Sequence, residues 1–171
     1  MTDFRLEATG TTPEERFRAL FSRHYAAVYR YAGRRLGREE AADAAAEAFT
    51  VAWRKISHVP AEPETLPWLY GVARRVVANA ERGRRRRERL AARAALDASD
   101  DASPPDRAGV LAALAGLRAD DREVLRLAAW EGLDPQAMGL ALGCSPNAAA
   151  IRLHRARRRL EDAMNDTEGE P

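Results

Sequence analysis

Residues 134–157 read DPQAMGLALGCSPNAAAIRLHRAR and predict two short helices joined by a tight turn. Asp134 can cap a helix whose first position is Pro135, and Gly143 stands where that helix must stop and turn. Ser145 can then cap the second helix. Two short helices around a glycine-containing turn are the layout of a DNA-binding helix-turn-helix, so the sequence predicts binding to double-stranded DNA.

The second of these helices divides into two faces. Its inner face carries Ala149, Leu153, Ala156 and Leu160. The N-terminal residues of a recognition helix reach base edges in the major groove, and positive charge further along meets phosphates. The residues expected to face bases are Asn147, Ala150 and Ile151, of which Ile151 can pack on a thymine methyl group. The residues expected to hold the DNA backbone are Arg152, Arg155 and Arg158.

Ser145 and His154 complete the set of side chains that we expect on the DNA-facing side. A simpler interpretation of the same pattern is an amphipathic helical hairpin with a solvated arginine face. Cys144 is expected to fill space in the turn rather than to act as a reactive thiol.

The composition of the whole chain predicts an all-α fold. A length of 171 residues suits one ordinary domain or two small ones, and a hydrophobic content of 46% is enough for packed cores. Alanine, leucine, arginine and glutamate dominate, and these residues lose little rotamer freedom in a helix. Runs of valine, isoleucine and threonine bounded by turns, which would indicate strands, are missing.

The apolar pattern predicts two small helical domains, residues 14–93 and residues 107–165, that fold separately. A flexible acidic linker at residues 94–106, which includes a double proline, is expected between them. The first domain is predicted to hold a helix that ends at Gly37, a helix over 39–56, a loop over 57–65 and a helix from Leu66. The buried side of the 39–56 helix is predicted as Ala42, Ala45, Ala46, Phe49, Ala52 and Trp53. The second domain is a four-helix domain, with helical patterns at 108–117, 120–131, 135–142 and 146–164.

Several classes of protein are disfavoured. A single cysteine, Cys144, leaves no internal disulfide and no cysteine-cluster metal site. Residues 1–13 lack the apolar core of a signal peptide, and no stretch has the length of a membrane span, so we expect a soluble cytoplasmic protein. The three histidines stand far apart and form no recognisable catalytic site. We therefore expect no enzyme activity, no cofactor and no metal.

Positive charge is concentrated rather than spread. All but one of the 28 basic residues are arginine, since Lys55 is the only lysine. Arginine-rich composition explains that total but not the run Arg84–Arg87. This run is either a solvated helix end or a phosphate contact.

Two further stretches carry a family resemblance. Residues 42–55 read ADAAAEAFTVAWRK, and residues 68–79 read WLYGVARRVVAN. Together with Glu131-Gly-Leu and the helix-turn-helix, in this order, they resemble sigma factors of bacterial RNA polymerase, of the small extracytoplasmic-function (group 4) type. The resemblance spans about residues 14–162.

The resemblance implies that the chain joins core RNA polymerase, directs it to a promoter and helps to open the duplex. The C-terminal domain would read the −35 element as duplex, and the N-terminal domain would capture unstacked bases of the −10 element as single strand. The core-polymerase contacts that it implies are Asp43 and Glu47. The flipped base would be held mainly by the loop 56–65. The −10 contacts are expected at His58, Arg74, Arg75, Asn79 and Arg82. A cognate anti-sigma factor is a further expected partner.

The chain departs from the family pattern at several of these positions. Ala44–Ala46 are smaller than the usual residues. Gly71, Arg75 and Asn79 replace the commoner arginine, asparagine and aspartate, and Ala150 replaces a frequent lysine. These departures bear on promoter specificity rather than on the general role.

Other functions fit parts of the pattern. A DNA-binding regulator could use residues 14–93 for dimerisation or sensing, and it would bind operators without polymerase. A helical adaptor would carry its arginines for compositional reasons and would bind no DNA at low salt. For Glu39, Glu40, Asp43 and Glu47 the plain alternative is a solvated carboxylate face. A di-iron site would need Glu-x-x-His pairs, which the chain lacks near these residues. The sequence leaves open the promoter, the inducing signal and the anti-sigma factor.

Overall fold

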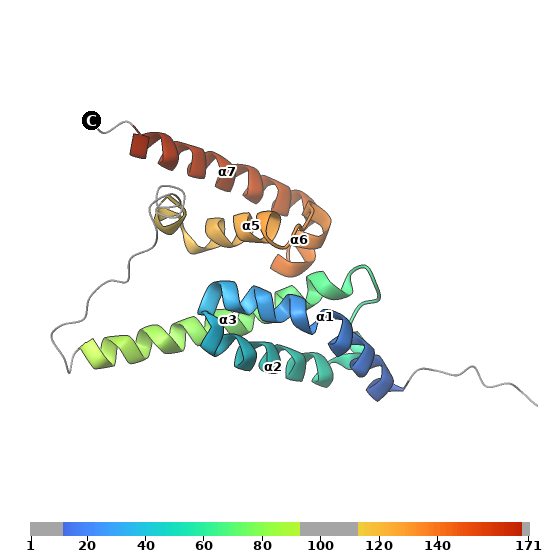
Figure 1. Ribbon diagram of the computed structural model, residues 1–171. Coiled ribbons are helices and arrows are strands. Elements are labelled where there is room, and N and C mark those ends of the chain that lie inside the picture. The colour runs from blue at the N-terminus through green and yellow to red at the C-terminus, as the bar shows by residue number, and fades with distance from the viewer. Residues whose placement is uncertain (1–11, 93–112, 169–171) are drawn as a thin grey trace, which may run out of the picture.

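The computed structural model describes residues 12–92 and 113–168, and every regular element in them is helical (Figure 1). The helices are α1 (Pro13–Leu36), α2 (Arg38–Arg54), the short 3₁₀ helix η1 (Ile56–His58), α3 (Thr65–Ala92), α5 (Ala119–Ala129), α6 (Pro135–Leu142) and α7 (Pro146–Glu168). One more helical turn covers residues 113–116. The all-α prediction is confirmed. Among the described helices, none combines the length and the apolar character that a membrane crossing requires. The predicted linker at 94–106 lies outside the described residues.

Helices α1, α2 and α3 form a bundle from the first half of the chain (Figure 1). Thr12 starts α1 with a reciprocal cap: its side chain accepts from the Glu15 amide, and the Glu15 carboxylate accepts from the Thr12 amide. Gly37 joins α1 to α2 with a φ of 88°, a value that glycine adopts without a steric penalty. The largest fully buried side chains of this bundle are Tyr31, Phe49, Leu69 and Val28.

The buried face of α2 differs from the predicted one. Ala42, Ala46 and Trp53 were expected to be buried and are exposed, with 40% of the Trp53 surface open to solvent. The residues that pack inward are Ala41, Ala44, Ala45, Ala48, Phe49 and Ala52. Ala45, Phe49 and Ala52 are buried as predicted, so the helix is turned by less than one residue, which is less than about 100°. An alanine-rich helix gives little contrast between its faces, so spacing alone does not fix its orientation. Phe49, which is buried in the predicted face and in the observed one, packs against the rings of α1.

The connection between α2 and α3 is held by side chains that bond to its backbone. Arg16 of α1 donates to the Val59 carbonyl, and the Thr65 hydroxyl donates to the Pro60 carbonyl at 2.8 Å. The His24 ring lies 2.7 Å from a Glu62 carboxylate oxygen. Residues 57–65, predicted as a loop, therefore follow a fixed path into α3, and the first two of them belong to the 3₁₀ helix Ile56–His58.

Helices α5, α6 and α7 form the second half. Leu127 and Met138 are fully buried between them, and α7 contributes Ala149, Leu153 and Ala156. The inner face predicted for the helix after residue 145 is confirmed for these three residues, and Leu160 is half-buried beside them.

The two halves pack directly against each other. Helix α6 lies on α3, and the buried apolar residues of both halves form one continuous cluster (Figure 1). A Cβ atom built on Gly71 of α3 would lie 3.1 Å from the Ala141 carbonyl oxygen of α6, so the two backbones are in close contact there. The sequence patterns predicted each half but not this interface.

The aromatic cluster of α1 and α2 offers a test of the core packing of Phe49. Phe49 is 2% exposed, whereas Phe21, which contacts it, is 40% exposed. We expect Phe49→Ala to lower the free energy of unfolding by about 3–5 kcal/mol because it leaves a cavity in the core. Phe21→Ala, the matched control, should cost clearly less, since its ring is already partly hydrated. Urea unfolding followed by circular dichroism measures both, and equal losses would contradict the burial of Phe49.

Candidate nucleic-acid interface

The helix-turn-helix is built by the caps that its sequence predicts. Asp134 caps α6 by accepting from the Ala137 amide at 2.8 Å, and Gly143 ends the helix in the left-handed conformation with φ 69° and ψ 40°. The Ser145 hydroxyl accepts from the Ala148 amide at 3.2 Å at the start of α7. The predicted capping residues are confirmed, and the DNA-facing candidate Ser145 is already occupied as a cap.

Gly139 is a determinant of this turn that sequence reasoning missed. A Cβ atom built on it would lie 2.8 Å from the Cys144 carbonyl oxygen and 3.3 Å from the Pro146 nitrogen. Since both neighbours are backbone atoms, α6 and the start of α7 can approach this closely only over a glycine. Gly139 lies inside the first helix of the motif, one turn before the predicted stop at Gly143. A glycine at that place in a helix is the signal that could have identified this residue.

Helix α7 presents most of the predicted DNA-facing side chains to solvent. Those that are exposed are Asn147, Ile151, Arg152, His154, Arg155 and Arg158, while Ala150 is half-buried. Ile151 is 42% exposed, a large value for an isoleucine on an ordered helix. Within the described residues, Arg155 and Arg158 enter no ion pair, whereas their neighbour Arg159 binds Asp121 at 2.6 Å. The exposed side chain of Ile151 therefore suits contact with a base, and the unpaired guanidinium groups of Arg155 and Arg158 suit contact with phosphates.

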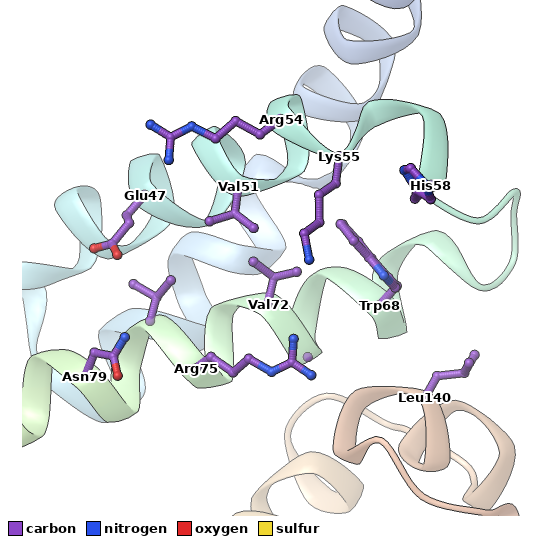
Figure 2. A pocket seen from close by; sticks show the side chains of 12 residues that line it. Glu47, Val51, Arg54, Lys55, His58, Trp68, Val72, Arg75, Asn79 and Leu140 are labelled. Carbon is purple, nitrogen blue, oxygen red and sulfur yellow. The ribbon is translucent and has the colours of Figure 1, made fainter.

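A second surface is a pocket of about 490 Å³ between α2, η1 and α3 (Figure 2). Its walls combine an indole ring, four basic or imidazole side chains and an amide. The lining residues are Glu47, Val51, Arg54, Lys55, His58, Trp68, Gly71, Val72, Arg75, Val76, Asn79 and Leu140. An aromatic face beside cationic groups is the usual means of holding unstacked bases and their phosphates.

The pocket gathers three of the five −10 candidates, namely His58, Arg75 and Asn79. Arg82 lies one turn further along α3 and donates to the Asn79 side-chain oxygen. Arg74 is not part of this pocket. It faces the second half of the chain, where it lines a cleft with Glu123 and Arg152.

Arg54 and Lys55 belong to the pocket but were not among the predicted contacts. Both stand at the end of α2, next to the loop that was expected to hold the flipped base. Two adjacent basic residues directly before such a loop are the signal that could have identified them. They add positive charge opposite Arg75, and Glu47 is the one carboxylate lining the pocket.

The carboxylates of α2 lie on the outer surface of the bundle. Asp43 and Glu47 are both exposed and stand one turn apart. No group of three potential metal ligands occurs in the parts of the chain that the structure describes. Of the basic run that follows on α3, Arg84 and Arg87 lie 3.9 and 3.7 Å from the carboxylate of Glu40, so this run is partly neutralised within the protein.

A charged network joins the two halves beside these surfaces. Arg35 of α1 donates to Glu123 of α5 from Nε at 2.8 Å and from Nη2 at 3.1 Å, and to Glu131 from Nη1 at 2.9 Å. Tyr31 donates to Glu123 at 2.7 Å, and Arg34 also binds Glu131. The side chains of Arg35 and Glu131 are 2% and 0% exposed.

Burial sets the ionisation of this network. Burial and then the charge of Glu123 raise the pKa of Tyr31 far above its ordinary value, so the phenol keeps its proton and donates it to the hydrogen bond. Burial alone would lower the pKa of Arg35, but the hydrogen bond and charge of Glu123, together with the charge of Glu131, raise it above the ordinary value. Burial and the charges of Arg35 and Arg122 lower the pKa of Arg126 nearby.

Both halves match families of known proteins. Residues 20–87 match Sigma-70 region 2, and residues 107–160 match Sigma-70, region 4. The chain is 34% identical over 114 residues to the RNA polymerase sigma factor CarQ of Myxococcus xanthus, covering 63% of this chain and 66% of CarQ. It is 32% identical over 126 residues to the probable RNA polymerase sigma factor RfaY of Xanthomonas campestris pv. campestris, covering 67% of this chain and 32% of RfaY.

Two solved structures share the fold. The sigma factor RpoE in complex with the anti-sigma factor NepR, from Bartonella quintana, gives a TM-score of 0.63 at 22% identity and covers 87% of this chain and 96% of its own. CnrH in complex with the cytosolic domain of CnrY gives a TM-score of 0.61 at 23% identity, covering 88% of each chain. At these identities the likeness establishes the fold alone.

Gly139 allows a test of the turn that carries the interface. We expect Gly139→Ala to destabilise the protein by about 1–3 kcal/mol, because the new methyl group meets backbone that cannot move aside cheaply. Gly83→Ala on α3 is the matched control: its Cβ would meet only the Arg87 guanidinium at 3.5 Å, and the better helix former should stabilise slightly. Thermal unfolding measures both. A Gly139→Ala variant as stable as Gly83→Ala would contradict the close contact.

Proposed function

This chain belongs to the sigma-70 family of RNA polymerase sigma factors, and we propose that it binds core polymerase, reads −35 and −10 promoter elements and promotes transcription initiation. The observation that carries the proposal is the order of regions 2 and 4 along one chain, each with an exposed surface suited to nucleic acid. The factor acts by binding and positioning, so it is not itself an enzyme and needs no cofactor. Its place of action is the cytoplasm.

Reading of the −35 element is assigned to α7. The helix offers Asn147 and Ile151 at its start, where base edges come within reach, and Arg155 and Arg158 further along. The Ser145 cap fixes where α7 begins, and Gly143 fixes the angle between the two helices of the motif. This division separates residues that choose the sequence from residues that supply affinity.

Capture of the −10 element is assigned to the pocket between α2, η1 and α3. Trp68 provides a stacking surface, and Arg75, Lys55 and Arg54 provide positive charge around it. His58 and Asn79 add polar groups able to contact base edges. Arg75 and Asn79 stand where the family commonly has asparagine and aspartate, so this pocket is expected to prefer a different −10 sequence from the common one.

Contact with core polymerase is assigned to Asp43 and Glu47, whose carboxylates are exposed one turn apart on α2. An anti-sigma factor is proposed as a regulatory partner, and RpoE with NepR is one pair of that kind. A regulator that binds operators without polymerase is the alternative that the first experiment below separates.

The test of the polymerase contact is a binding titration on core RNA polymerase. We expect the double variant Asp43→Ala with Glu47→Ala to bind about tenfold more weakly, because paired carboxylates on one face act on a single partner surface. Glu39→Ala, on the exposed start of the same helix, is the control and should bind as the unchanged protein does. Unchanged affinity in the double variant rejects the assignment, and no binding by the unchanged protein rejects the proposed function.

The division of labour along α7 is tested by titrating the full chain on matched and scrambled −35 duplexes at several salt concentrations. Arg155→Ala should weaken all duplexes about equally and lower the salt slope by roughly one unit, because one phosphate contact is lost. Asn147→Ala or Ile151→Ala should instead change which duplex is preferred, at a cost of about 1–3 kcal/mol on the best site. If Arg155→Ala changes base preference while the other two do not, the helix is rotated in the groove.

A further inference from the structure

A further cleft lies between α1, α3 and α5, and it shares no lining residue with the −10 pocket or with α7. It has a volume of about 280 Å³, and its walls bring five arginines together. One of them, Arg35 of α1, is already held in the charged network described above. The other four are Arg74 and Arg85 of α3 and Arg122 and Arg126 of α5. We call the cleft that these four residues line the arginine cleft.

The positive charge of the arginine cleft is only partly balanced. Among the residues that the structure describes, none of its four arginines forms an ion pair. Of the carboxylates in its walls, Glu123 is held by Arg35, which leaves Glu81 and Asp120. Four arginines that form no ion pair therefore face two carboxylates, an excess of two positive charges. A concentration of one sign of charge in a cleft attracts small ions of the opposite sign.

Two of these arginines have buried donor atoms without an acceptor. The Nε atoms of Arg74 and Arg126 are both buried, and neither has a hydrogen-bond partner in the described parts of the chain. A buried donor without an acceptor is costly, and for that reason most buried donors in proteins have one. The planar guanidinium group binds two oxygen atoms of a phosphate at once. The two side chains therefore bring donors suited to phosphate oxygens into the walls of the cleft.

The arginines of the cleft also repel one another. Burial and then the charges of Arg35 and Arg122 lower the pKa of Arg126. Arg122 is fixed in its place, because it donates from Nη1 to the Ala115 carbonyl at 3.1 Å. A bound anion would offset this repulsion, and the guanidinium groups would hold it by charge-assisted hydrogen bonds.

The size and depth of the cleft indicate the kind of anion. Ligand pockets commonly have volumes of about 300–1,000 Å³, so a cleft of about 280 Å³ suits a small ligand. Its wall includes Tyr31 and Arg35, whose side chains are almost fully withdrawn from water. A compact anion can enter such a cleft, whereas a continuous nucleic-acid backbone would have to run across its opening. Two linked phosphate groups carry enough negative charge to neutralise the excess of two positive charges.

We propose that the arginine cleft binds a small anion with a diphosphate group, either inorganic pyrophosphate or the diphosphate of a nucleotide. Arg74 donates to the phosphate oxygens from α3 and Arg126 from α5, and the two remaining arginines supply further positive charge. The ligand links α3 to α5, so its binding stabilises the folded chain. The site does not rest on the proposed function, because it uses neither the −10 pocket nor the exposed face of α7.

The first experiment titrates the full chain with inorganic pyrophosphate at constant ionic strength and follows binding by calorimetry. The unchanged protein should bind pyrophosphate at one saturable site. Arg126→Met should weaken this binding about tenfold or more, because charge-assisted hydrogen bonds are lost. Arg157→Met is the matched control: it removes the same charge at an exposed position of α7 that does not line the cleft. The control should change the affinity by less than about twofold, since solvent and salt screen a distant exposed charge.

The second experiment separates binding of a ligand from support of the fold. Arg74→Met keeps an apolar stem and removes the buried donor. Without pyrophosphate the variant should unfold at the same temperature as the unchanged protein or at a higher one, because a donor without an acceptor is gone. Pyrophosphate should raise the unfolding temperature of the unchanged protein but not that of the variant. Earlier unfolding of the variant without pyrophosphate would show that Arg74 supports the fold, and it would overturn the assignment.

Three probes identify the source of the phosphate groups: inorganic pyrophosphate, ADP and an AT-rich single-stranded oligonucleotide. Equal affinity for pyrophosphate and ADP assigns the cleft to the diphosphate alone, and higher affinity for ADP assigns it to a nucleotide; both outcomes support the proposal. The proposal is overturned if neither small probe binds saturably, or if Arg126→Met and Arg157→Met weaken binding equally. Oligonucleotide binding that Arg126→Met abolishes, with no binding of the small probes, assigns the cleft to nucleic acid instead. Since no polymerase is present, none of these outcomes decides the proposed function.

Discussion

A guanidinium group buried between two carboxylates sets the arrangement of this protein. Arg35 lies on the core side of α1, and nearly all of its side chain is withdrawn from water. A charge in that position is tolerable only with partners, and Glu123 and Glu131 supply them from the other half of the chain. The stacking of Arg35 on the Tyr31 ring, 3.5 Å from the ring centroid, fixes its direction. The positions of α5 and α6, and hence of the reading helix, follow from this requirement.

Local structure was predictable because it depends on residues that are close together in the sequence. The caps at Asp134 and Ser145 and the stop at Gly143 each depend on residues within four positions, and the structure has all three. The inner face of α7 also followed from spacing, since leucine and alanine alternate there with arginine. The same reasoning failed for α2, whose small side chains resemble one another. In that helix both the buried Phe49 and the exposed Trp53 contact aromatic rings of α1, so aromatic character alone does not separate inside from outside.

Long-range arrangement was not predictable from the same patterns. Arg74 carries the residue type that a −10 contact needs, yet its position on α3 turns it toward α5 and α7. Arg54 and Lys55 belong to the pocket only because α2 ends beside the start of α3. Glu131 lay within a recognised family motif, but nothing in its neighbourhood in the sequence indicates a buried partner ninety-six residues away. Such pairings depend on how the two halves pack against each other, and the spacing of apolar residues along the sequence does not specify that packing.

The exposed and the buried polar groups of this fold therefore contribute in different ways to binding and to stability. In the proposed function, the exposed arginines on α7 and around the pocket keep their hydration until DNA replaces it, so they would supply affinity that varies with salt. Arg35, Glu123 and Glu131 have already lost their hydration, so they supply orientation and little net stability. A glycine at position 71 makes that orientation sterically possible. A substitution at Gly71 would thus change how α6 packs on α3 without altering any α7 side chain that is proposed to contact DNA.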